Sequence, residues 1–154
     1  MMKHILFAIA LVCLISACSE EFLLERKEDK LIGRWEIEKV FYKSDHALFR
    51  DNITEDYRND IMEFHGDYTA EYYDYSVNTV FPGDWQIHLD RDSYYTDDGN
   101  GSNTEYFIDA VFYEMFPDGD FSFFGSIDRL NKNKLDFEAR DRRGTYTFKL
   151  CRRD

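Results

Sequence analysis

The sequence has few cysteines and no apolar run long enough to span a membrane. Its 154 residues include three cysteines, at positions 13, 18 and 151. The longest apolar stretch, Ile5 to Ile15, covers 11 residues, whereas a helix needs roughly 20 to cross a bilayer. We therefore expect no permanent transmembrane helix.

The sequence also lacks the motifs of the common enzyme classes. No serine stands in a nucleophile-elbow setting, and no glycine-rich loop is suited to hold a phosphate. Among the 31 acidic residues, no two stand apart as the carboxylate pair that glycoside hydrolysis requires. We therefore interpret the protein as a non-enzyme, and we predict neither catalytic residues nor a cofactor.

No metal site is predicted either, because His46, His65 and His88 lack zinc-ligand spacing and Cys151 has no partner cysteine. His88 is expected to face solvent, since Trp85, Ile87 and Leu89 alternate with it. The stretch from Asp97 to Glu105 does place oxygen-bearing side chains near one another, at Asp98, Asn100, Ser102 and Glu105. Calcium favours such ligands, but the helix-loop-helix pattern is absent. We therefore interpret this stretch as a polar hairpin loop and keep it as a candidate ligand or cation loop.

Basic residues are in the minority, with 19 Lys and Arg against 31 Asp and Glu and a net charge of −12. Nucleic-acid binding needs clustered cations that displace counterions, so nucleic acid is excluded as a partner. The acidic balance favours either a solvated surface or an encounter with a basic protein.

The amino terminus predicts export from the cytoplasm. Lys3 and His4 form a short basic start, the apolar stretch follows, and the small residues Ser16 and Ala17 precede Cys18. This is the pattern of a signal peptide. The chain from Cys18 onward has 137 residues, enough for one domain.

The segment Ile15-Ser16-Ala17-Cys18 resembles the lipobox of bacterial lipoproteins, which implies an acylated Cys18 carrying several chains and hence a durable anchor. Ser19-Glu20-Glu21 resembles the surface-export signal of lipoproteins from the Bacteroidota, the alternative being a flexible linker. We expect a signal peptide over 1–17, a lipidated tether with a turn of helix over 18–30, and a domain over 31–154. The expected location is the cell envelope, at the outer membrane, on either the periplasmic or the surface face.

From Leu31 onward the composition is that of short strands joined by turns, with one turn predicted at Pro82-Gly83-Asp84. The polar segment from Ser44 to Arg58 is predicted to be a loop that holds a short helix. In several runs apolar residues occupy every second position, which predicts antiparallel strands with one buried face. Two architectures satisfy this pattern, an eight-stranded up-and-down barrel and a two-layer sandwich, and the barrel leaves no exposed edges. The eight predicted runs are Ile32–Tyr42, Asp60–His65, Tyr68–Tyr75, Asp84–Asp90, Thr104–Phe116, Phe121–Ile127, Lys134–Arg140 and Thr145–Cys151.

This all-β pattern resembles the lipocalin-like domains of Bacteroidota lipoproteins. The residues that carry the resemblance are Gly33-x-Trp35, Phe64-His65-Gly66-Asp67, Ile127-x-x-Leu130, Leu135-x-Phe137 and Tyr146-x-Phe148-x-Leu150-x-Arg152. The resemblance implies a closed barrel in which Arg152 of the last strand packs across Trp35 of the first.

Aromatic residues make up 18% of the chain, and they either fill the barrel or line a cavity in it. An eight-stranded barrel is near the size at which side chains just fill the interior. We expect a mostly filled interior, occupied by Phe107, Phe112, Phe116, Phe121, Phe123, Phe124, Phe137 and Phe148. Tyr72, Tyr73 and Tyr75 are expected to pack across strands, with a carbohydrate or protein contact as the alternative.

Three hypotheses of function follow from these observations. The first is a lipid-anchored, non-enzymatic binding or interaction module. The second is an acidic inhibitor of a basic secreted enzyme or, in a hollow barrel, a carrier of a small apolar ligand. The third is an enzyme, which a buried carboxylate or histidine beside a cleft would favour.

Overall fold

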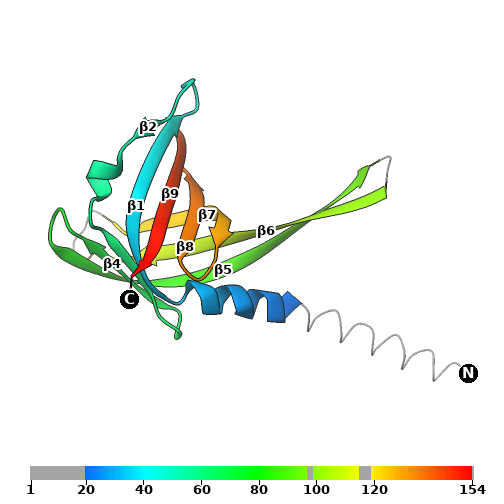
Figure 1. The fold of residues 1–154 in the computed structure, drawn as a ribbon, viewed down its shortest axis with the longest axis horizontal. Coiled ribbons are helices and arrows are strands. Elements are labelled where there is room, and N and C mark those ends of the chain that lie inside the picture. The colour runs from blue at the N-terminus through cyan, green and yellow to red at the C-terminus, as the bar shows by residue number, and fades with distance from the viewer. Residues whose placement is uncertain (1–19, 97–98, 115–118, 154) are drawn as a thin grey trace, which may run out of the picture.

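The structure is a computed structural model that describes residues 20–96, 99–114 and 119–153. It contains a helix over residues 20–31 followed by a closed antiparallel barrel (Figure 1). Eight strands form the wall, and the short β2 pairs beside β1 without belonging to it. The strands are β1 (Gly33–Ser44), β2 (Asp51–Asn52), β3 (Ile61–Phe64), β4 (Thr69–Asp74), β5 (Thr79–Thr96), β6 (Gly99–Phe112), β7 (Phe121–Leu130), β8 (Lys134–Arg140) and β9 (Gly144–Arg153).

Each strand of the wall pairs with its neighbour in sequence, and β1 pairs with β9 from Arg34↔Arg153 to Ser44↔Gly144. This last pairing closes the sheet, so the predicted up-and-down barrel is confirmed. The wall thereby protects the edges that a sandwich would leave open. The segment between β1 and β3, predicted to hold a short helix, contains the 3-10 helix η1 (Thr54–Tyr57).

One predicted turn is wrong, because Pro82-Gly83-Asp84 lies inside β5, where Pro82 pairs with Glu71. The chain turns earlier, just after β4. There the Asp74 carboxylate accepts hydrogen bonds from the backbone amides of Ser76 and Val77, and Asn78 has a φ of 52°. Both features are typical of turn residues.

The interior is occupied by large apolar side chains, many of them aromatic. Phe137 and Phe148 stack with ring centroids 4.9 Å apart, and Phe148 also meets Phe123 edge to face at 5.2 Å. Two of the predicted interior rings point elsewhere: Phe107 and Phe124 stack on the outer face. Phe116 lies outside the described residues. The filled interior is therefore built from Phe112, Phe121, Phe123, Phe137 and Phe148 together with the other core residues, such as Trp35, Ile37, Met62, Phe64, Tyr72, Trp85, Ile108, Leu135 and Leu150.

The helix over residues 20–31 replaces most of the predicted tether and is held against the barrel rather than free. Its Leu31 is fully buried, and the ammonium of Lys27 lies 4.4 Å from the centre of the Tyr106 ring. The hydroxyl of Tyr68 donates to the carboxylate of Glu28 at 3.1 Å. In the described part of the chain, no helix is both long and apolar enough to cross a membrane.

Candidate functional site

The two ends of the barrel differ, and the candidate site lies at the end away from the helix, which we call the far end. At this end β7 begins at Phe121, yet it pairs with β8 only from Gly125↔Ala139 onward. The wall is therefore unpaired between the two strands over residues 121–124. A pocket of about 190 Å³ opens there. It is lined by Tyr57, Ser122, Phe123, Phe124, Ala139, Arg140, Asp141, Tyr146 and Phe148.

Aromatic rings form most of the wall of this far-end pocket. Tyr146 and Phe148 share the inward face of β9 because strand side chains alternate, and their rings stack at 6.2 Å. Tyr57 reaches in from η1 and meets Phe148 edge to face at 5.5 Å. Burial raises the pKa of the Tyr57 hydroxyl, so it remains a proton donor at neutral pH.

The rim of the pocket carries charge. The guanidinium of Arg140 donates to the Asp45 carboxylate at 3.0 Å, with both side chains exposed to solvent. Asp141 accepts backbone hydrogen bonds from Arg143 and Gly144, each at 2.7 Å, which fixes the β8–β9 turn. The rim therefore offers a cation and fixed polar groups to a ligand whose apolar part lies among the rings.

Behind the rings lies a buried polar pair. Asp60 is 2% exposed; its carboxylate accepts from the Tyr72 hydroxyl at 2.5 Å and from the backbone amide of Tyr75 at 2.8 Å. The Tyr72 ring lies 5.8 Å from that of Phe123, which lines the pocket. Burial raises the pKa of Asp60, and burial together with this hydrogen bond raises the pKa of Tyr72.

The hydrogen bonds of the buried pair are already made within the protein. Each oxygen of Asp60 already accepts a hydrogen bond, and the Tyr72 ring contacts the ring of Phe123, which lines the pocket. The residues that line the pocket include no histidine and no cysteine. Sequence reasoning did not single out Tyr57, Asp60, Arg140 or Asp141, because nothing in their local patterns distinguishes them from ordinary turn and strand residues.

The predicted signature residues meet at the opposite end, which we call the near end. The guanidinium of Arg152 lies 4.4 Å from the centre of the fully buried Trp35 ring, so the predicted contact is present. Arg152 also donates to the backbone carbonyls of Lys30, Ile32 and Lys132. Gly33 has a φ of 129°, and a β-carbon there would lie 2.1 Å from Arg152 Nη1. Only glycine leaves room for this arginine.

The other predicted site residues lie elsewhere in the chain. Asn100, Ser102 and Glu105 lie in β6 rather than in a loop, because the hairpin continues to Thr96↔Gly99. Asp98 and Cys18 lie outside the described residues. As predicted, His88 faces solvent, with 45% of its side chain exposed. In the described part of the chain no group of three or more His, Cys, Asp or Glu side chains is placed to hold a metal ion.

Cys151 lies on the outside of the wall, at a polar hollow of about 540 Å³ beside β1. Burial, followed by the charge of Glu38, raises the pKa of its thiol. The thiolate is the reactive form, so this environment makes Cys151 a poor nucleophile.

Comparison with protein-family models, curated proteins and solved structures finds no match to this chain.

Proposed function

We propose that the protein is a lipid-anchored, non-enzymatic binding module of the cell envelope, and that it holds a ring-sized ligand in the far-end pocket. The observation that carries this proposal is the opening between β7 and β8, where a pocket is lined by five aromatic side chains, among them the inward-facing Phe123, Tyr146 and Phe148. The near end, where Trp35 is 0% exposed, offers no such access.

The volume of the pocket limits the size of the ligand. A drug-sized molecule needs roughly 300 Å³ or more, whereas an apolar cavity of about 150 Å³ accepts benzene. The far-end pocket, at about 190 Å³, therefore suits a single ring with a polar substituent. The ring would pack among Phe123, Tyr146 and Phe148, and the substituent would face Arg140 at the rim.

The lipid anchor rests on the amino-terminal pattern that ends at Cys18. The described helix begins at residue 20, so it would follow an acylated Cys18 almost directly and hold the near end towards the membrane. The closed eight-stranded barrel supports a lipocalin-like domain of a Bacteroidota lipoprotein, and placement at the outer membrane belongs to the same proposal.

The test of the pocket is binding of three ring-sized probes, indole, benzoate and methyl glucoside, to the lipid-free domain by NMR. At least one should bind with a dissociation constant between about 10 μM and 1 mM, a free energy of roughly 4 to 7 kcal/mol. Ala139→Leu should abolish that binding by filling the pocket. Glu138→Leu adds the same side chain to the adjacent, outward position and should leave it unchanged. The proposal fails if none of the probes binds, or if Ala139→Leu binds as well as the parent.

A separate test addresses the anchor. Cys18→Ala should prevent incorporation of a labelled fatty acid and move the protein from the membrane fraction to the soluble or unprocessed pool. If the variant still takes up label and stays on membranes, the lipoprotein assignment is wrong.

A further inference from the structure

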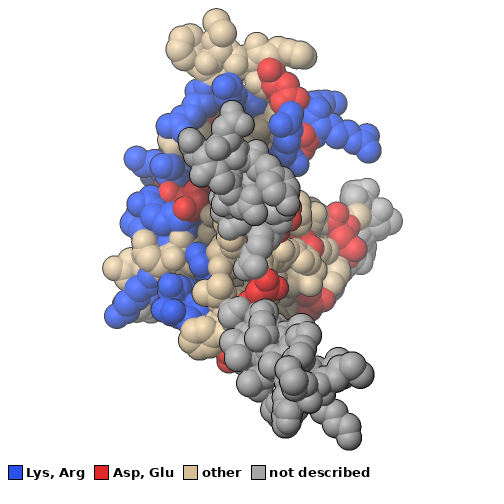
Figure 2. Space-filling model, turned by 90° about the vertical axis from the view of Figure 1, so that its right-hand side faces the viewer, with Lys and Arg blue, Asp and Glu red and all other residues tan. Residues whose placement is uncertain are grey.

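Charge is unevenly distributed over the molecule. From residue 59 to residue 128 the chain carries 16 acidic residues and a single basic one, Arg91. From residue 129 to the end it carries nine basic and four acidic residues. Figure 2 shows the result in space: Lys and Arg gather along the left and the top of the view, and Asp and Glu are most numerous at the right, below them. The strands β3 to β7 therefore form an acidic flank.

An aromatic pair lies on the outside of this flank. Phe107 of β6 and Phe124 of β7 stack in parallel, with centroids 5.7 Å apart and planes 9° from one another. Phe124 is 53% exposed, and the ring of His88 lies 6.3 Å from it. Exposed apolar patches bounded by polar groups are typical of interaction sites. We call Phe107, Phe124 and His88 the outer aromatic patch.

Carboxylates lie on the same face of β5 and β6 as the patch, since strand side chains alternate. Oδ2 of Asp109 lies 3.6 Å from Nε2 of His88 and accepts a hydrogen bond from the side-chain amide of Gln86 at 3.3 Å. Asp84 accepts from the hydroxyl of Tyr113 at 2.6 Å, and Asp90 is exposed two residues beyond His88. An aromatic face beside carboxylates provides a ring for a cation to cover and opposite charges to pair with it.

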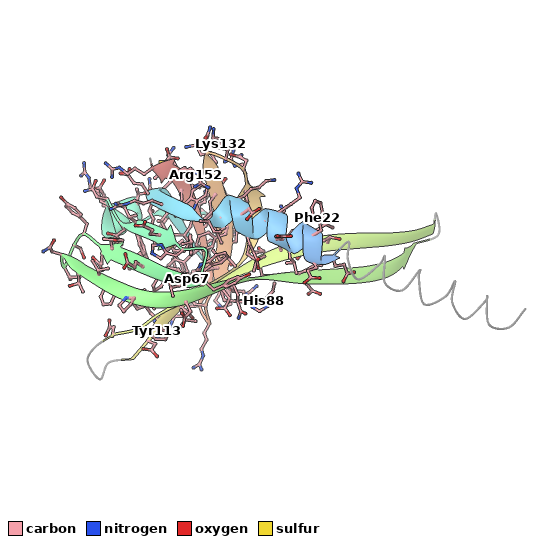
Figure 3. All side chains as sticks on the ribbon, turned by 90° about the horizontal axis from the view of Figure 1, so that it is seen from below. Phe22, Asp67, His88, Tyr113, Lys132 and Arg152 are labelled. Atoms are coloured by element: carbon pink, nitrogen blue, oxygen red, sulfur yellow. The ribbon has the colours of Figure 1, made fainter. Side chains whose placement is uncertain are left out.

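The patch lies where a long arm leaves the barrel. The pairing of β6 with β7 begins at Phe107↔Ser126, whereas β5 and β6 remain paired out to Thr96↔Gly99. The part of β6 before Phe107 pairs with β5 alone, and the two strands form a ribbon that projects from the wall (Figure 1). The labelled His88 lies near the base of that ribbon (Figure 3). A partner seated on the patch would therefore also lie against the ribbon.

We infer that this surface docks an arginine- or lysine-rich segment of a partner protein. A guanidinium or ammonium group covers the rings of Phe107 and Phe124, while Asp109 and neighbouring carboxylates pair with the remaining cations. Two copies that met through this same flank would repel each other, because the flank is acidic in both. The patch and the far-end pocket share Phe124, whereas Phe107, His88 and Asp109 belong to the patch and do not line the pocket.

The experiment measures binding of a fluorescent octa-arginine peptide to the lipid-free domain by anisotropy at several salt concentrations. Because any acidic protein attracts such a peptide, the informative variant is Phe107→Thr, which leaves the charge unchanged. It should weaken binding about threefold, the size of an exposed cation–π contact. Asp109→Asn should weaken binding by about twofold to threefold and reduce its salt dependence.

Matched controls separate this surface from general electrostatic attraction. Phe49→Thr removes an exposed ring, 83% accessible, that lies outside the patch. Asp56→Asn removes one exposed charge from η1. Both should bind the peptide like the parent to within about 1.5-fold. Equal losses in Phe107→Thr and Phe49→Thr, or no loss in Phe107→Thr, would overturn the inference.

Two further readouts complete the test. Phe107→Thr should leave binding of the ring-sized probes at the far-end pocket unchanged. A loss of peptide binding can then be distinguished from a loss of binding at the pocket. Sedimentation of the domain alone should show a monomer. A salt-sensitive dimer that Phe107→Thr disrupts would instead identify a second copy as the occupant and overturn the choice of partner.

Discussion

The near and far ends of the barrel are made of similar residues but are closed in different ways. At the near end Arg152 covers Trp35 and is fixed by three backbone carbonyls. At the far end β8 ends before it can cover the start of β7, so Phe123 and Tyr146 line an open pocket. An inward-facing ring is therefore part of the core where a neighbouring strand or side chain covers it, and it lines a pocket where nothing covers it.

Truncation at the near end should give the largest loss of stability. Trp35 is fully buried, and its indole donates to the carbonyl of Leu31 at 2.7 Å. Trp35→Ala should lower the free energy of unfolding by about 3 to 5 kcal/mol, through lost burial and the cavity left behind. Urea denaturation followed by circular dichroism measures this. A loss below about 1 kcal/mol would show that the near end is not a sealed core.

Removing the Arg152 side chain should lower the free energy of unfolding less than removing the Trp35 ring does. Arg152→Ala loses a cation–π contact of roughly 0.5 to 2 kcal/mol together with its hydrogen bonds, so we expect a total loss of about 2 to 3 kcal/mol. The emission of Trp35, measured in a Trp85→Phe background, should shift to the red or be quenched. The control is Arg153→Ala, a 53% exposed side chain paired with Glu36 at 3.2 Å, which should lose less than about 1 kcal/mol. An unchanged spectrum and stability in Arg152→Ala would remove it from this role.

The matching truncation at the far end should be milder. Phe123 is only partly buried, since it faces the pocket, and Phe123→Ala should lower stability by about 1 to 3 kcal/mol. The same variant should weaken binding of the ring-sized probes. If its loss of stability equals that of Trp35→Ala, the two ends are equally sealed and the comparison fails.

Alternation predicted most of the strands, and the resemblance to lipocalin-like domains implied the contact of Arg152 with Trp35 at the near end. Trp35 and Arg152 lie in the first and last strands, so closing the barrel brings them together. The far end could not be predicted, because Asp60 and Tyr72 become partners only through the register Ile61↔Tyr73 of β3 and β4.

The outer aromatic patch shows a second limit of sequence reasoning. Phe123 and Phe124 are adjacent, so strand geometry sends one of them outward. The sequence does not indicate which, since either choice buries one ring of similar size. Only the register of β6 against β7, in which Asp109 pairs with Phe124, places Phe124 outside with Phe107.

The buried Asp60 gives the smallest expected effect and tests whether the far end contains a carboxyl group out of contact with water. Burial raises its pKa above the ordinary value, so at intermediate pH the folded protein holds a proton that the unfolded chain releases. The stability that this group contributes is therefore complete below its unfolded pKa, about 3.9, and is lost as pH rises through the folded pKa.

Asp60→Asn cannot titrate and keeps an acceptor for the Tyr75 amide, so its stability at neutral pH should lie within about 1 kcal/mol of the parent. Urea denaturation from pH 4 to pH 8 should show the parent losing stability relative to Asp60→Asn as pH rises. Tyr72→Phe should steepen that trend, because the Tyr72 hydrogen bond lowers the pKa of Asp60. Parallel pH profiles for the parent and Asp60→Asn would show instead that water reaches this carboxylate and that the far end is open to a greater depth than its aromatic lining.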